Sequence, residues 1–189
     1  MWFFWKIVFF IMGWKADKDF PHHIKKAIVI AGPHTSAWDF IIGVGFRSAL
    51  RMKNGKFLGK DALFKGPFGF IFHWLGVTPV DRFSKNGVVD QVVEKFNSSD
   101  SLLLGLSPEG TRKKVDQLRT GFYFMAQKAN VPIIMMGLDY ENKRITISEP
   151  FYTTNNQEED FKKIIRFFAP IKGKRPELGM QHLLKSLVN

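Results

Sequence analysis

The 189-residue sequence contains no cysteine. This absence excludes disulfide bonds, a thiolate nucleophile and cysteine-bound zinc, and it fits a reducing compartment. Acidic residues are scarce as well, because 17 Asp and Glu stand against 28 Lys and Arg, which gives a net charge of +11. Such a charge implies an anionic partner, which is nucleic acid, an anionic membrane or an acidic carrier protein. The length is that of one domain with its own core.

Aromatic residues are abundant instead, with 20 Phe and 5 Trp. They gather in apolar runs rather than in basic stretches, and no aromatic-basic RNA-recognition signature is present. This distribution favours lipid over nucleic acid as the anionic partner, and we expect no nucleic-acid binding.

The first 14 residues, "MWFFWKIVFFIMGW", are apolar except for Lys6. As a helix they would be about 21 Å long at 1.5 Å per residue, shorter than the roughly 30 Å hydrocarbon core of a bilayer. They lack the small-residue cleavage site of a secretory signal, and tryptophan prefers the headgroup level. We therefore expect residues 1–14 to lie in one leaflet, and residues 20–189 to form a separate domain. Two alternatives are a helix that closes over the core and an uncleaved single span.

Apolar strand patterns alternate with helical patterns along the remaining chain, without internal repeats or low-complexity linkers. This alternation predicts a single-domain α/β fold with a mixed, mostly parallel sheet flanked by helices. Predicted strands cover residues 26–31, 57–58, 77–80, 101–107, 131–138 and 144–148, and predicted helices cover residues 38–52, 67–76, 86–96, 120–130, 161–168 and a short segment around 183. Pro67 is expected to begin one helix and Asn86 to cap the next. The 161–168 helix carries Lys162, Lys163 and Arg166 on its polar side and is expected to help the N-terminal helix dock on an anionic leaflet.

Polar residues follow three of the predicted strands directly. The first loop carries His34 and Asp39, the second ends at Arg82, and the third is "SPEGTRKK", residues 107–114. Ligands of open α/β sheets bind where strands end and loops begin. The sequence thus predicts a site at this edge of the sheet.

His34 and Asp39 are five positions apart in the first loop. A neutral imidazole can take a proton from an alcohol, and a carboxylate on its other ring nitrogen fixes the tautomer and stabilises the imidazolium. No G-x-S-x-G elbow supplies a serine. The hydroxyl would then belong to the substrate, and the reaction would be direct acyl transfer onto an alcohol. The alternative is that Asp39 caps the following helix.

The third loop combines a glycine with charged neighbours. Glu109 and Arg112 flank Gly110, whose missing side chain lets backbone approach a ligand. Arg112 and the two lysines after it suit a phosphate, and so does Arg82 at the end of the second loop. The alternatives are a solvated basic turn and, for Arg82, a surface pair with Asp81.

Four blocks over residues 27–138 resemble the glycerolipid acyltransferases of the lysophosphatidic-acid acyltransferase (PlsC-like) type. "HTSAWD" resembles the family's H-x4-D motif, "GKDALFKGPFGFIFHWLGVTPVDR" (residues 59–82) its second block, "SPEGTR" (107–112) its FPEGTR block and "VPII" (131–134) its fourth block. The order and the approximate spacing also agree with the family.

The resemblance implies a 1-acylglycerol-3-phosphate O-acyltransferase-like enzyme in which residues 20–189 form the acyltransferase domain. His34 would deprotonate the acceptor hydroxyl and Asp39 would orient His34. The acceptor and its phosphate would be held by Arg82, Lys60, Glu109, Gly110, Thr111 and Arg112, and the acyl path or its support would be Val131, Pro132 and Ile133. The reaction needs no metal or redox cofactor.

The sequence departs from the family pattern at several positions. Pro33 stands where asparagine is usual, Ser107 replaces an aromatic residue, and Met135–Met136 replaces a proline-containing end of the fourth block. None of these positions belongs to the His34–Asp39 pair, but together they leave the acceptor open.

The resemblance also implies the partners and the location. The acyl donor would be an acyl carrier protein or CoA thioester, the acceptor a lysolipid, and the docking surface an anionic membrane on its cytoplasmic face. Two alternatives stay open, which are a different acceptor such as an amino-acid head group and a catalytically silent lipid-binding protein.

Overall fold

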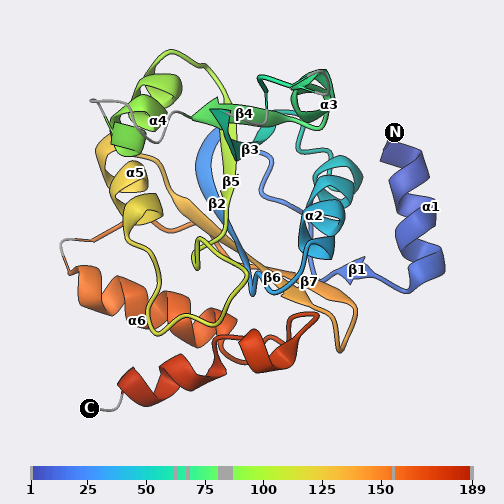
Figure 1. Ribbon diagram of the computed structural model, residues 1–189, viewed down its shortest axis with the longest axis vertical. Helices are drawn as coiled ribbons and strands as arrows, with labels where there is room; N and C mark the ends of the chain where they lie inside the picture. The colour runs from blue at the N-terminus through green and yellow to red at the C-terminus, as the bar shows by residue number, and fades with distance from the viewer. Residues whose placement is uncertain (1, 62–63, 67–68, 81–86, 155, 188–189) are drawn as a thin grey trace.

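A seven-stranded sheet runs through the computed structural model, which describes residues 2–61, 64–66, 69–80, 87–154 and 156–187 (Figure 1). The strand order is β1-β7-β6-β2-β5-β3-β4. The strands are β1 (Lys15–Ala16), β2 (Lys26–Gly32), β3 (Gly55–Lys60), β4 (Val77–Val80), β5 (Leu102–Leu106), β6 (Ile133–Asp139) and β7 (Arg144–Ile147).

The five strands from β6 to β4 are mutually parallel, while β6 and β7 are antiparallel. The register aligns Ile30 of β2 with Leu106 of β5, and Gly32 of β2 with Gly137 of β6. The carboxyl ends of these strands therefore meet at one edge of the sheet, and the loops that follow them are neighbours. The predicted single-domain, mostly parallel α/β fold is confirmed.

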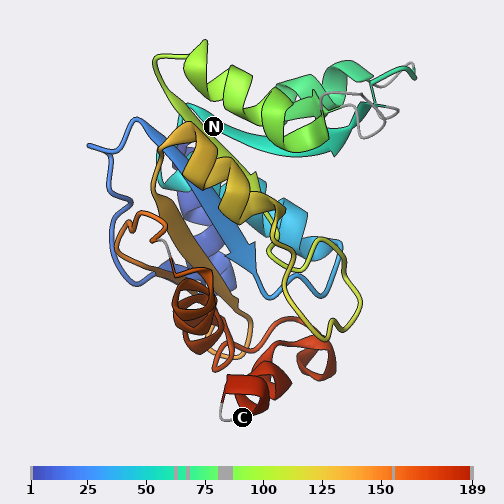
Figure 2. The same cartoon turned by 90° about the vertical axis from the view of Figure 1, so that its left-hand side faces the viewer.

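Helices cover both faces of the sheet because side chains along each strand alternate between the faces. Ile28 and Ile30 contribute to a core with α4, α5 and α6, whereas Ala27 and Val29 contribute to a second core with α1 and α2. Figure 2 shows the layer formed by α4, α5 and α6 in front of the sheet. The helices are α1 (Trp2–Met12), α2 (Trp38–Ala49), α3 (Gly69–Trp74), α4 (Gly87–Asn97), α5 (Gly121–Ala129), α6 (Gln157–Phe168) and the 3-10 turns η2 (Pro176–Leu178) and η3 (Gln181–Leu187).

Helix α1 both packs on the domain and exposes an apolar face. Phe9 is buried and stacks on Phe46 of α2 with ring centroids 4.0 Å apart, while Phe10 is 85% exposed. Gly45 of α2 allows this approach, since a Cβ there would lie 2.6 Å from the Phe9 and Trp5 rings. Among the described helices, none combines the length and the apolarity needed to cross a bilayer.

Most element predictions hold, with shifted boundaries. The helix predicted for residues 38–52 ends at Ala49, the strand predicted for 57–58 spans Gly55–Lys60, and the two-residue strand β1 was not predicted. The predicted helix starts at Pro67 and Asn86 lie outside the described residues. The helix predicted for residues 161–168 is confirmed within α6, with Ile164, Ile165 and Phe168 buried in the core. Lys163 and Arg166 are exposed on its other side, and docking of this helix on lipid stays a prediction.

Candidate active site

His34 and Asp39 are in contact at the carboxyl end of β2. His34 Nδ1 lies 3.1 Å from Asp39 Oδ2, and the His34 side chain is 27% exposed. The peptide bond between Gly32 and Pro33, which leads into this loop, is cis. A carboxylate can only accept a hydrogen bond, so the proton sits on Nδ1 and the lone pair on Nε2 is left for a substrate.

Asp39 is buried, and both of its carboxylate oxygens are hydrogen-bonded. Oδ2 accepts the backbone N–H groups of Thr35 at 2.7 Å and Ser36 at 2.8 Å, while Oδ1 accepts the Tyr140 hydroxyl at 2.7 Å. Burial opposes ionisation, but the bonds from His34, Ser36 and Tyr140 outweigh it and hold the pKa of Asp39 below its ordinary value. Asp39 is therefore a carboxylate at neutral pH, as the partner of a histidine base must be.

The alternative use of Asp39 as a helix cap is not observed. Helix α2 begins after Ala37, which makes no side-chain capping bond. The Asp39 side chain instead folds back over the loop that carries His34, so it fixes both the backbone and the ring of the histidine.

Glu109 lies behind the backbone of His34. Its Oε1 accepts the His34 N–H at 2.6 Å, and its Oε2 accepts the Ser107 hydroxyl at 2.8 Å. The side chain is only 2% exposed, and burial raises the pKa of Glu109. We expected Glu109 to line the acceptor site; the structure places its carboxylate where it supports the histidine loop. Ser107, the departure from the family's aromatic residue, gives this carboxylate a second donor.

The rest of the third loop lies closer to solvent. Gly110 has φ +66°, a left-handed conformation that favours glycine, and its N–H donates to the Ser107 carbonyl. Arg112 is exposed and Thr111 is half-buried, with its hydroxyl accepting the Lys113 N–H at 3.3 Å. These positions leave the Arg112 guanidinium accessible to an anion.

Lys60 and Arg82 are the two predicted phosphate-binding residues of the second block. Lys60 is the last residue of β3 and pairs with Val80, so its backbone ends at the same edge of the sheet as β2. Its side chain and the whole of Arg82 lie outside the described residues.

Val131, Pro132 and Ile133 lie at the opposite end of β6 from the histidine loop. Ile133 is the first residue of that strand and is fully buried, Val131 is also buried, and the Pro132 carbonyl accepts the Ile28 N–H at 3.0 Å. This placement favours the structural one of their two predicted roles.

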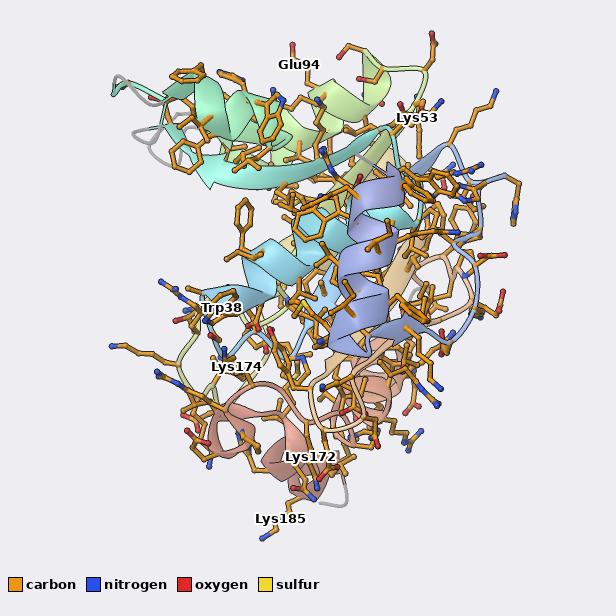
Figure 3. The ribbon with its side chains drawn as sticks, turned by 90° about the vertical axis from the view of Figure 1, so that its right-hand side faces the viewer. Trp38, Lys53, Glu94, Lys172, Lys174 and Lys185 are labelled. Carbon is orange, nitrogen blue, oxygen red and sulfur yellow. The ribbon has the colours of Figure 1, made fainter. Side chains whose placement is uncertain are left out.

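Two neighbours of the dyad were missed in the sequence. Tyr140 follows β6 directly and His34 lies two residues after β2, and this strand-end position is the only local signal for Tyr140. The other is the segment around residues 173–175. The Arg175 N–H donates to the Thr35 hydroxyl at 3.1 Å, and Lys174 Nζ lies 4.6 Å from the centre of the Trp38 ring (Figure 3). This segment adds positive charge beside the histidine loop.

Metal-assisted chemistry has no evident ligand set within the described ranges. No group of three or more His, Cys, Asp or Glu side chains there is arranged to hold a metal ion. The arrangement that is present, a buried carboxylate behind a half-exposed imidazole, can accept a proton from a hydroxyl and return it.

A partly exposed histidine backed by a buried carboxylate, at the carboxyl edge of a mostly parallel sheet, has the chemistry that acyl transfer to a hydroxyl requires. The chain belongs to the Acyltransferase family, whose sequence profile matches residues 15–139. The fold is similar to the crystal structure of the 1-acyl-sn-glycerophosphate (LPA) acyltransferase PlsC from Thermotoga maritima. The two share 19% sequence identity at a TM-score of 0.56, with 87% of this chain and 73% of that chain covered. A comparison with curated proteins gives no significant match.

Proposed function

We propose that the protein moves a fatty acyl group from a thioester to the hydroxyl of a lysophospholipid, with 1-acylglycerol-3-phosphate as the default acceptor. The observation that carries the proposal is the His34–Asp39 pair, with Asp39 Oδ2 at His34 Nδ1 and the ring partly open to solvent. The acceptor class is supported by the similar fold of the T. maritima protein PlsC, an LPA acyltransferase.

The proposed reaction uses His34 as general base. Nε2 takes the proton of the acceptor hydroxyl while the alcohol oxygen attacks the thioester carbonyl carbon. Collapse of the tetrahedral intermediate breaks the C–S bond, and the imidazolium returns its proton to the leaving sulfur. Asp39 stabilises the imidazolium between these two transfers. Holding both substrates in one site supplies several kcal/mol of the barrier reduction, because the encounter becomes intramolecular. No cofactor enters the scheme.

The acceptor's phosphate would bind the basic residues beside the dyad. Arg112 is exposed on the loop after β5 and offers a guanidinium fork. Lys60 and Arg82 are proposed partners from the neighbouring strand ends, and Gly110 and Thr111 would shape the approach. The donor is an acyl carrier protein or CoA thioester, and the +11 net charge would attract either one.

We place the protein on the cytoplasmic face of a membrane, held peripherally or monotopically by residues 1–14. Most of the large exposed hydrophobic side chains of the described residues gather on three helices; Phe124, Tyr152 and Leu184 lie elsewhere. Those on the three helices are Phe3, Phe4, Ile7, Phe10, Ile11 and Met12 on α1, Trp38 and Ile41 on α2, and Phe70, Ile71 and Trp74 on α3. These helices lie on the same side in Figure 1. Docking through this face would bring the acceptor lipid to the start of α2, where His34 lies.

A donor-by-acceptor activity matrix with lipid product analysis tests this function. The purified protein is assayed with acyl carrier protein and CoA thioesters against lysophosphatidate, other lysolipids and amino-acid lipids. We expect acylation of lysophosphatidate. Transfer only to an amine head group would show that the acceptor is an amino-acid lipid instead. Absence of transfer to every acceptor would favour a catalytically silent lipid-binding protein.

His34→Ala should lower kcat/KM by about 10²–10⁴-fold, the range for loss of a general base. His23→Ala, an exposed histidine before β2, serves as control and should keep wild-type activity. Circular dichroism and vesicle binding should be unchanged in both variants. Appreciable turnover by a folded His34→Ala protein would contradict the role of His34.

A further inference from the structure

The Tyr140 hydroxyl lies at the back of the catalytic pair. It donates to Asp39 Oδ1 at 2.7 Å, across 101 residues of sequence. Burial and the adjacent Asp39 carboxylate raise the pKa of Tyr140 far above its ordinary value, so the phenol stays protonated and donates.

Three segments fix the position of the Tyr140 ring. The residue directly follows β6, its N–H donates to the Lys172 carbonyl at 2.9 Å, and the Trp14 ring lies edge-on at a centroid distance of 5.0 Å. The sheet and the C-terminal segment thus fix the Tyr140 backbone, and Trp14, two residues after α1, packs on its ring. A Tyr140 ring fixed in this way can in turn fix the position of the Asp39 carboxylate.

We propose that Tyr140 is a positioning residue. Its bond to Oδ1 keeps Oδ2 of the Asp39 carboxylate directed at His34 Nδ1, and we call this chain of hydrogen bonds the His34–Asp39–Tyr140 relay. Tyr140 touches no substrate and acts through Asp39. The effect on turnover rests on the proposed acyl transfer, whereas the effect on the histidine ring does not.

The two Asp39 oxygens have different partners, which is why a donor on Oδ1 matters. Oδ2 faces His34 Nδ1 and the N–H groups of Thr35 and Ser36, and Oδ1 faces Tyr140. Without the phenol, the buried Oδ1 loses its bond, and the carboxylate is held only through Oδ2. The phenol also draws negative charge away from the side of the carboxylate that faces the imidazole.

Other charged groups near the pair come from separate elements. Glu109 bonds the His34 backbone from the loop after β5, and Lys174 lies over the Trp38 ring beside it. Lys172, whose carbonyl accepts from Tyr140, pairs through Nζ with Glu141 at 2.7 Å. None of these contacts involves the Tyr140 hydroxyl, so removing that oxygen leaves them in place.

The chain contains a second tyrosine–carboxylate pair away from the site, which provides a control. The Tyr123 hydroxyl donates to Asp160 Oδ2 at 2.9 Å and to the Thr154 carbonyl at 2.8 Å, and burial beside Asp160 raises the pKa of Tyr123 to about 12. Tyr123→Phe therefore removes the same chemical bond from the core between α5 and α6. It should lower the melting temperature without affecting the base.

The test compares Tyr140→Phe with Tyr123→Phe in kcat, KM and the pH profile of kcat/KM. We expect Tyr140→Phe to lower kcat about tenfold, the effect of one hydrogen bond to a charged group, with KM within about twofold of the wild type. The acid limb should move to higher pH by roughly half a unit. The sign follows because a carboxylate without the phenol attracts the imidazolium proton more strongly, so the neutral base appears only at higher pH. In an Asp39→Asn background the same change should cost no further activity.

An NMR titration of the His34 ring resonances tests the positioning role of Tyr140 independently of the proposed acyl transfer. A midpoint that rises in Tyr140→Phe but not in Tyr123→Phe supports the relay, even if the wild-type protein transfers no acyl group and the proposed function fails. Equal midpoints and equal pH profiles for both folded variants would overturn the relay and leave the proposed function standing.

Discussion

At the scale of single residues, the buried Glu109 carboxylate makes a prediction about stability and pH. Its raised pKa means that the folded protein holds the Glu109 proton more tightly than the unfolded chain does. Between the unfolded value, about 4.3, and the raised folded value, the folded state binds more protons than the unfolded state. The contribution of Glu109 to the free energy of unfolding therefore falls as pH rises through this window.

Glu109→Gln should remove that dependence while keeping the bonds, because its amide oxygen can accept from His34 N–H and its NH₂ can donate to the Ser107 oxygen. In urea denaturation from pH 4 to 8, its stability relative to the wild type should rise with pH and then level off. Glu109→Ala should instead lose about 1–3 kcal/mol, since it leaves the His34 N–H without an acceptor. A constant difference between Glu109→Gln and the wild type across this range would contradict the raised pKa.

The residues of the site differ in how far the sequence could predict them. His34 and Asp39 are near in the chain, and the H-x4-D spacing was enough to pair them, although their catalytic roles stay predictions. Glu109 was recognised as important, but a sequence does not say which way a carboxylate turns. Tyr140 contacts Asp39 across 101 residues, so only the sheet topology, which sets β6 beside β2, brings them together.

At the scale of elements, the contact between α1 and α2 depends on one glycine. A Cβ on Gly45 would lie 2.6 Å from both Phe9 Cζ and Trp5 Cε3, whereas a Cβ on Gly43 would meet only Phe57 at 3.8 Å. Gly45→Ala should therefore destabilise the protein by about 1–3 kcal/mol through overpacking. Gly43→Ala, in the same helix, should be neutral or stabilise by up to about 1 kcal/mol through helix propensity.

Chemical denaturation of the two glycine variants measures this difference, and the tryptophan emission, to which Trp5 contributes, reports the displacement of α1. If Gly45→Ala were as stable as Gly43→Ala, with the same emission, the α1–α2 packing described above would be wrong. The comparison is informative because both substitutions add one methyl group to α2.

Sequence periodicity predicted the presence of helices and strands well, but it predicted their packing partners less well. Asn130 ends α5 as expected, in a left-handed conformation with φ +50°. The apolar stripe of α6 lies in the protein core, and the basic side chains Lys163 and Arg166 on its other side stay exposed. The N-terminal helix packs on the core through Phe9 and exposes Phe10, while its contact with a membrane stays a prediction. The register of β1 against β7 had no local signal because the strand is two residues long.

At the scale of the whole molecule, the exposed apolar face and the positive charge lead to one prediction about membranes. A +11 protein should bind anionic vesicles more tightly than neutral ones, and raising the salt from 0.05 to 0.5 M should weaken the anionic binding because the charges are screened. Apolar insertion should survive the salt. A binding isotherm at both salt concentrations separates the two contributions.

Phe10→Ser should weaken vesicle binding at high salt by about tenfold, because it removes an apolar side chain that is 85% exposed on α1. Phe124→Ser is the control, since Phe124 is exposed on α5, among the helices of the opposite face of the sheet. Both side chains reach solvent, so each variant should keep most of the wild-type stability, which thermal unfolding can check. Helix α1 packs on α2, and α2 carries Asp39 in its first turn. A bilayer bound by Phe10 would therefore lie beside the helix that carries Asp39. Equal vesicle affinities of the two variants would place the membrane contact elsewhere and leave the exposed α1 face without this role.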